Sequence, residues 1–214
     1  MFPKKIHLLL ILLSVHINIY AQTIDSLYIK LDLGLQAIQD ERYVDAWGNL
    51  KYYIDNAPIE EKETTNYTQA AANYRKAIGE INKKRKVCYK EAVKAKEQGQ
   101  QNQLDSLCQD YLRLCVQDDS KKTFEYTFAL TQHAMKRHRK GDTNECLLCL
   151  NKVLEIRHSS HLIDSIHMGE TLNLIASIEG QRGNYNKAIH LCTRALNLYE
   201  NRYEKKGLYY GKKY

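Results

Sequence analysis

The sequence predicts an all-α protein made of about four helical hairpins. Helix-forming residues dominate the 214-residue chain, which holds only two prolines, and the alternation of apolar and polar residues typical of strands is nearly absent. Three glycines, Gly99, Gly141 and Gly183, recur at a step of 42 residues between stretches with helical apolar periodicity. A fixed step of this length is typical of repeat proteins, so each unit is expected to be a helix, a turn at the glycine and a second helix.

The first 21 residues are predicted to be a cleavable signal peptide. Lys4 and Lys5 precede a short apolar run, and Ala21 supplies a small residue just before Gln22. The apolar run is shorter than the roughly 20 residues that span a bilayer. Without the two lysines, 30 basic residues face 25 acidic ones, a net charge of +5. We therefore expect a periplasmic or secreted protein with no membrane span after cleavage and no nucleic-acid partner.

The four units align when the turn residue is counted as position 15 of each unit. They then cover about residues 27–58, 85–118, 127–158 and 169–204. Position 8, on the first helix, is small in all four units, and position 20, on the second helix, is small in three. Small residues at a crossing let two helices approach at the short end of the usual 8–10 Å. The residues expected to pack the helices are Gly34, Ala46, Ala92, Ala134, Cys146, Ala176 and Ala188.

This pattern resembles the tetratricopeptide repeat, in which antiparallel helical hairpins stack into a right-handed superhelical α-α solenoid. The resemblance implies a single repeat domain over residues 22–214. Two features depart from the family: the step of 42 exceeds the common period of 34, and 58 residues separate Glu41 from Gly99. Residues 59–84 must therefore form an added or lengthened helix, with a start near Thr65.

The resemblance also implies a ligand groove on the concave face, formed by recurring positions of the first helices. A protein or peptide segment would bind there, and an acidic group in that segment would suit the basic run Lys136–Lys140. The groove residues expected on this basis are Tyr28, Leu31, Leu35, Tyr89, Phe128, Thr131, Met135, His138, Arg139, Asn173 and Ser177.

Cysteines and histidines offer a rival interpretation. Cys146 and Cys149 form a pair suited to metal or redox chemistry, and His158, His161 and His167 cluster nearby in the sequence. No second cysteine pair with ligand spacing accompanies them. We therefore expect the six cysteines to be small core residues, with a Cys146–Cys192 bridge as the alternative, and no metal or cofactor.

The function expected from these observations is a non-catalytic binding scaffold in the cell envelope. The sequence has no Gly-rich phosphate loop, nucleophile elbow or His-Glu-x-x-His motif, and no catalytic residue is predicted. Two alternatives stay open. One is a truncated periplasmic sensor domain, because exported Bacteroidetes regulators carry similar repeats. The other is a metal- or thiol-dependent enzyme that uses His158, His161, His167 or the Cys146 and Cys149 pair. The sequence leaves the oligomeric state open.

Overall fold

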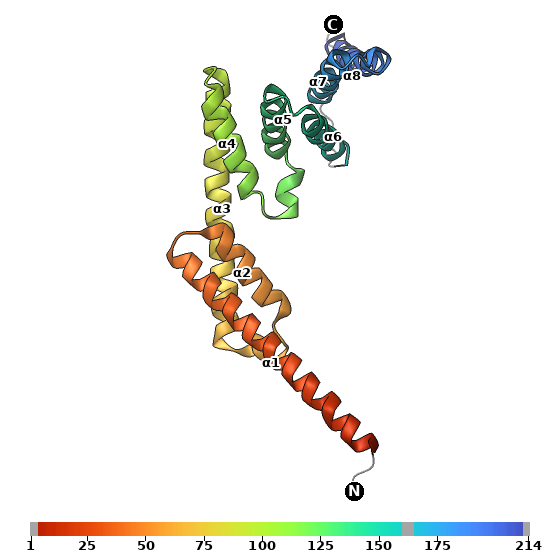
Figure 1. Cartoon of the computed structure of the whole chain (residues 1–214). Helices are drawn as coiled ribbons and strands as arrows, with labels where there is room; N and C mark the ends of the chain where they lie inside the picture. The colour runs from red at the N-terminus through yellow and green to blue at the C-terminus, as the bar shows by residue number, and fades with distance from the viewer. Residues whose placement is uncertain (1–3, 160–164, 212–214) are drawn as a thin grey trace. The chain divides into compact units, whose positions relative to one another are not determined.

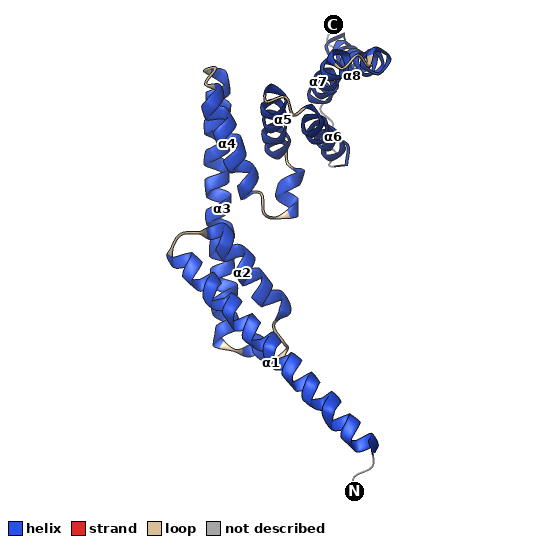
Figure 2. Cartoon of the chain, in the orientation of Figure 1, coloured by secondary structure: helices blue, strands red, loops and turns tan. Residues whose placement is uncertain are grey.

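The computed structural model describes residues 4–159 and 165–211, with side chains described for 21–117, 119–159 and 166–201. Over these residues all regular secondary structure is helical, which confirms the all-α prediction (Figures 1 and 2). The predicted signal peptide lies largely outside the described side chains and stays a prediction. The helices are α1 (Lys4–Gln39), α2 (Tyr43–Asn56), η1 (Glu60–Glu63), α3 (Thr65–Glu97), α4 (Gln101–Leu114), η2 (Asp118–Lys122), α5 (Phe124–Arg139), α6 (Thr143–Ser159), α7 (Ser165–Gln181) and α8 (Tyr185–Gly211).

The helices form two compact units, Met1–Lys84 (unit 1) and Arg85–Tyr214 (unit 2), where the sequence analysis expected one domain. The division falls within α3, which runs without a break through Gly79. Its first part belongs to unit 1 and its last part to unit 2. Residues 59–84 are thus η1 followed by a lengthened helix. The hydroxyl of Thr64 caps this helix by accepting a hydrogen bond from the Tyr67 N–H at 3.2 Å.

Unit 1 is a hairpin of α1 and α2 packed on the first part of α3. Leu50 and Tyr53 of α2 are fully buried at its centre, together with Ala70 and Ala77 of α3. The two small alanines are seven residues, or about two helical turns, apart, so they lie on the same side of α3 and leave room for the larger residues of α2.

Unit 2 stacks its hairpins in the order of the sequence. Cys108 of α4 shares a buried cluster with Ala92 of α3 and with Ala129 of the following helix, α5. Leu150 of α6 likewise shares a cluster with Ile175 of α7. The second helices α4 and α6 therefore each bury their apolar side against the first helix of their own hairpin and of the next one. The right-handed superhelical course stays a prediction.

All four hairpin turns have the same backbone geometry. The residue after the turn residue donates its N–H to a carbonyl five residues earlier, and the turn residue itself donates to one three residues earlier, the pattern of a Schellman C-cap. The turn residue adopts a positive φ, which glycine reaches without steric cost. The four turn residues and their φ angles are Glu41 (55°), Gly99 (67°), Gly141 (83°) and Gly183 (80°).

The small residues predicted to pack the helices lie at the helix crossings. A Cβ at Gly34 would be 2.6 Å from Cγ of Leu50, so α1 and α2 approach too closely for any side chain there. At the same position of the other hairpins, Ala92, Ala134 and Ala176 are buried. At position 20, Ala46 and Cys146 are buried, whereas Ala188 is half-buried against the last core cluster.

Candidate functional site

A groove of about 880 Å³ lies in unit 2. Its walls come mainly from the first helices of three successive hairpins: the end of α3, then α5 and α7. One residue each from α6 and α8 completes it. The lining side chains are Tyr89, Val93, Lys96, Glu97, Phe124, Phe128, Thr131, Gln132, Met135, Arg157, His167, Glu170, Thr171, Asn173, Leu174 and Tyr199.

Helical periodicity explains why these side chains converge. On α3 the lining residues include Tyr89, Val93 and Lys96, at steps of four and three that place them on one face. On α5, lining residues at 124, 128, 131 and 135 follow the same spacing. The opposite sides of these helices are buried in the core clusters described above. The stacked hairpins therefore leave one side of each first helix free to face the groove.

Aromatic rings form the wall between α3 and α5. The rings of Tyr89 and Phe128 meet edge to face with their centroids 5.6 Å apart. Nζ of Lys96 lies 5.3 Å from the centroid of Phe128, within the range of a cation–π contact. Burial raises the pKa of the Tyr89 hydroxyl, so this group stays protonated at neutral pH and can donate a hydrogen bond. The wall is thus apolar with polar groups at fixed places.

A buried arginine lies at the α6 side of the groove. Only 5% of Arg157 is exposed, and its guanidinium donates hydrogen bonds to the hydroxyl of Thr171 at 3.0 Å and to the carbonyl of His167. Its Nε also donates to the hydroxyl of Thr127 at 3.3 Å. The ring of His167 meets that of Phe124 edge to face at 4.8 Å. Arg157 therefore ties α5, α6 and α7 together and sets the spacing of the groove walls.

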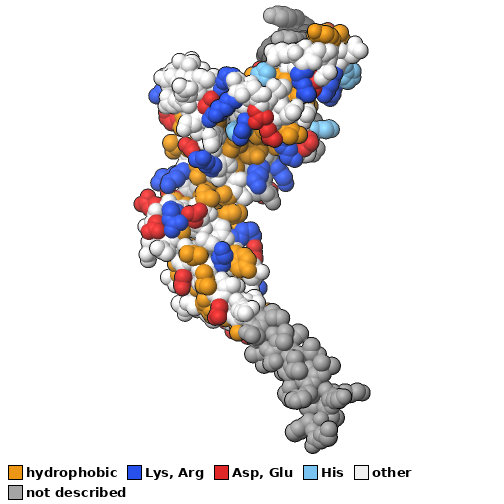
Figure 3. All heavy atoms as spheres, viewed as in Figure 1, with side chains coloured by type: hydrophobic (Ala, Val, Ile, Leu, Met, Phe, Trp, Pro, Cys, Tyr) orange, Lys and Arg blue, Asp and Glu red, His pale blue; other side chains and the backbone are white. Residues whose placement is uncertain are grey.

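The groove has a mixed charge. Lys96 and Arg157 are its cations, and Glu97 and Glu170 are its anions. The outer surface is similar: acidic and basic side chains are interspersed on the face drawn in Figure 3. A partner would therefore be selected by shape and by individual pairs rather than by an overall field of one sign.

Five of the predicted groove residues line this groove. They belong to the last part of α3, to α5 and to α7, the helices that form its walls. These residues are Tyr89, Phe128, Thr131, Met135 and Asn173.

The other predicted groove residues lie elsewhere. Arg139 is turned toward α4, where its guanidinium donates to both carboxylate oxygens of Asp105 at 2.8 Å. His138 and Ser177 do not line the groove. Because these three residues are near the turn ends of α5 and α7, the groove ends before it reaches them.

The predicted groove residues of the first hairpin belong to unit 1. Leu31 is buried in the core and Leu35 packs against it. The hydroxyl of Tyr28 donates to the carboxylate of Glu61 at 2.9 Å, and the buried Tyr53 hydroxyl donates to the same group. The hydrogen bonds from Tyr53 and then Tyr28 hold the pKa of Glu61 below its ordinary value. The side chains of Tyr28, Tyr53 and Glu61 hold the η1 segment against the hairpin. The predicted groove residues of this hairpin therefore contribute to the packing of unit 1.

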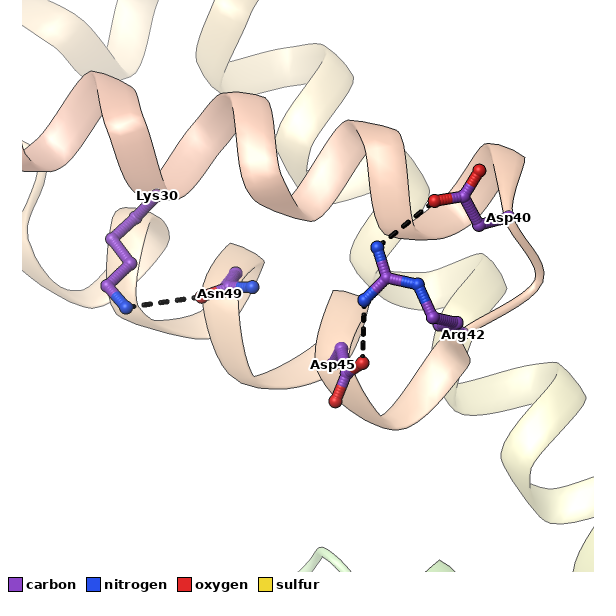
Figure 4. A network of polar contacts seen from close by, with 5 residues as sticks. All are labelled: Lys30, Asp40, Arg42, Asp45 and Asn49. Atoms are coloured by element: carbon purple, nitrogen blue, oxygen red, sulfur yellow. Dashed lines mark hydrogen bonds and ion pairs between the residues drawn. The ribbon is translucent and has the colours of Figure 1, made fainter.

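Unit 1 also carries an exposed polar network on its hairpin (Figure 4). The guanidinium of Arg42, directly after the turn, bridges Asp40 at 3.1 Å and Asp45 at 2.8 Å. Nζ of Lys30 donates to Oδ1 of Asn49 at 3.3 Å and so links α1 to α2. The paired carboxylates raise the pKa of Arg42. Because the ion pairs of Arg42 are about half exposed, each adds little stability to the turn.

Several groove residues were not predicted from the sequence, above all Arg157 and Tyr199. Both lie on second helices, whereas the family pattern counts first-helix positions only. A signal for Arg157 does exist, because a charged residue follows Val153 and Ile156 on the apolar side of α6. Phe124 could also have been found, since it precedes Phe128 by one helical turn.

The residues of the rival enzyme interpretation do not assemble into a site within the described part of the chain. No group of three or more His, Cys, Asp or Glu side chains there could hold a metal ion. His158 is exposed, His167 packs on Phe124, and His161 lies outside the described residues.

The cysteines are free thiols in this structure, including both members of the alternative Cys146–Cys192 bridge. Cys146 is buried, as a core residue should be, whereas Cys192 is exposed. Burial raises the pKa of Cys146 to about 11 and also raises that of Cys149. A raised pKa disfavours the thiolate, which is the form that attacks substrates and binds metals.

No helix in the described part of the chain has the length and apolar character that crossing a membrane requires. Neither protein-family models nor curated proteins give a match to this sequence.

Proposed function

We propose that this chain is a non-catalytic binding scaffold of the cell envelope, and that the unit 2 groove receives an extended segment of a protein or peptide. One observation carries the proposal: consecutive hairpins contribute the same side of their first helices to a single groove of about 880 Å³. A groove of this size, apolar with a few fixed polar groups, is suited to a ligand rather than to close packing. The four equal turns support the resemblance to tetratricopeptide repeats, and with it the right-handed course of the hairpins.

The side chains suggest what the segment contains. An apolar or aromatic residue would fit between Tyr89, Phe128 and Met135, where contact with the aromatic rings would add to the gain from burial. The amides of Gln132 and Asn173 can pair with the backbone of an extended segment. An acidic group would pair with Lys96, which is exposed and lies over Phe128.

The proposed location rests on the N-terminal sequence. A fusion of residues 1–30 to a reporter that is active only after export tests it directly. We expect activity in the parent fusion and its loss when Leu10 and Leu12 are both replaced by Arg, because the apolar core of the signal would be interrupted. Equal activity of the two fusions would contradict export by this segment.

The groove is tested by filling it. Peptides enriched from a random library on the full chain supply the probe, and their affinity is then measured by titration calorimetry. Met135→Trp should lower the affinity at least tenfold, because the larger ring would occupy the space between α5 and the neighbouring helices. Leu148→Trp is the matched control, since Leu148 is 63% exposed on α6 and does not line the groove. Unchanged binding by the Met135 variant, with helix content intact, would place the ligand elsewhere.

A further inference from the structure

The last helix has an apolar stripe that no other described part of the chain covers. Tyr185, Ile189, Cys192 and Leu196 recur at steps of four, three and four, so they share one face of α8, here called the α8 stripe. Ile189 is 65% exposed and Leu196 is 53% exposed. An exposed apolar stripe of this kind invites association with another apolar surface.

The hairpin register identifies what covers this face elsewhere in the chain. In the preceding hairpin, Leu147 and Leu150 hold the positions of Ile189 and Cys192, and they are 8% and 0% exposed. They share a buried cluster with Ala134 of α5, in their own hairpin, and with Leu172 and Ile175 of α7, the first helix of the next hairpin. The α8 stripe therefore corresponds to the surface of a second helix on which the first helix of the next hairpin packs.

The opposite half of that contact is exposed on α1. Ile29 and Leu33, here called the α1 stripe, hold the positions of Thr171 and Ile175 in α7. Thr171 and Ile175 are each 2% exposed, because they pack against α6. Ile29 is 57% exposed and Leu33 is 43% exposed. Within the described part of the chain, no second helix packs on this face of α1.

We propose that copies of this chain associate head to tail, with the α8 stripe of one copy packed on the α1 stripe of the next. The occupant is a second copy because the chain itself offers both halves of the contact, in the register that places Leu150 and Ile175 in one buried cluster. The association continues the α4 to α5 and α6 to α7 contacts at the next step of the array. It is heterologous, so it adds copies in one direction instead of closing as a two-fold dimer.

Two single substitutions separate this arrangement from the others. Ile29→Lys removes the α1 stripe and Ile189→Lys removes the α8 stripe, and neither should disturb folding because both side chains are exposed. In sedimentation of the full chain from 1 to 100 µM, the parent mass should rise with concentration and each variant alone should stay monomeric. An equimolar mixture of the two variants should form a dimer and grow no further, because only one working contact remains. Leu148→Lys, at an exposed site outside both stripes, should behave as the parent.

Other results would overturn the proposal. Dimers of the Ile29→Lys variant alone would mean two-fold pairing of α8. A parent that stays monomeric at 100 µM would mean that the stripes bind other proteins or nothing.

Oxidative crosslinking gives an independent reading. Leu33→Cys should form intermolecular disulfides with Cys192, because the equivalent residues Ile175 and Leu150 lie in one cluster. The products should be a ladder of multimers on a non-reducing gel, lost when Cys192→Ser is added. Crosslinked dimers of the parent through Cys192 alone would contradict the head-to-tail arrangement.

Discussion

Gly34 provides the sharpest test of the close hairpin packing. A Cβ added there would lie 2.6 and 2.7 Å from two side-chain carbons of Leu50 and 3.2 Å from its backbone nitrogen. The side chain of Leu50 is fully buried and cannot turn away, and the backbone contact requires α1 and α2 to separate. Overpacking of this kind costs about 1–3 kcal/mol. The better helix propensity of alanine returns up to about 1 kcal/mol. We therefore expect Gly34→Ala to lower the free energy of unfolding by about 1–2 kcal/mol.

The control lies on the opposite helix of the same hairpin. Gly48 is exposed within α2, and a Cβ there meets nothing within 4 Å. Gly48→Ala should therefore raise the free energy of unfolding by about 0.5–1 kcal/mol through propensity alone. Trp47, the one tryptophan of the chain, belongs to α2 and reports the unfolding of unit 1 by fluorescence. With a urea dependence of about 2 kcal/mol per molar, Gly34→Ala should shift the midpoint down by about 0.5–1 M. A shift of the same sign for both variants would refute the close crossing.

Two further predictions concern the turns. Glu41→Gly should raise the free energy of unfolding of unit 1 by about 0.5–1 kcal/mol, since Glu41 is the one non-glycine residue with a positive φ in the described chain; an unchanged Trp47 midpoint would contradict this. Glu179 is buried and accepts hydrogen bonds from Lys187 and Asn184, both at 2.6 Å, which lower its pKa. A carboxylate with a lowered pKa stabilises the fold above its ordinary pKa and loses this effect as the pH falls through the folded value. Glu179→Gln should therefore lower the free energy of unfolding by about 1–2 kcal/mol at pH 7. The difference should shrink between pH 5 and 3 in unfolding followed by circular dichroism, and a pH-independent difference would point to a steric cause.

Much of the fold follows from the sequence because the turns are local. The φ required at position 15 is set within a few residues, and glycine at three of the four turns marks it directly. The long α3 was harder to predict for a physical reason. In a sequence, a glycine inside a helical pattern can mark the end of the helix or a close contact with a neighbour. Gly79 marks neither, because α3 runs through it and a Cβ there would meet nothing within 4 Å. The division into two units falls within this helix, between Lys84 and Arg85.

The groove was predictable only in part, because it depends on contacts between residues far apart in the sequence. Helical spacing alone places Tyr89, Phe128 and Met135 on facing sides of neighbouring first helices. It cannot decide what a long, charged side chain does at the end of a helix. Arg139 could extend toward a ligand, yet Asp105, 34 residues earlier, fixes its guanidinium with two hydrogen bonds. Arg157 is the converse: its spacing from Val153 and Ile156 marks it as a cation on the apolar side of α6, but nothing local predicts that it reaches Thr171 of α7. The cation available to a ligand is therefore Lys96 rather than Arg139. Lys96→Gln should weaken the binding of an acidic peptide, whereas Arg139→Gln should mainly loosen the contact between α4 and α5.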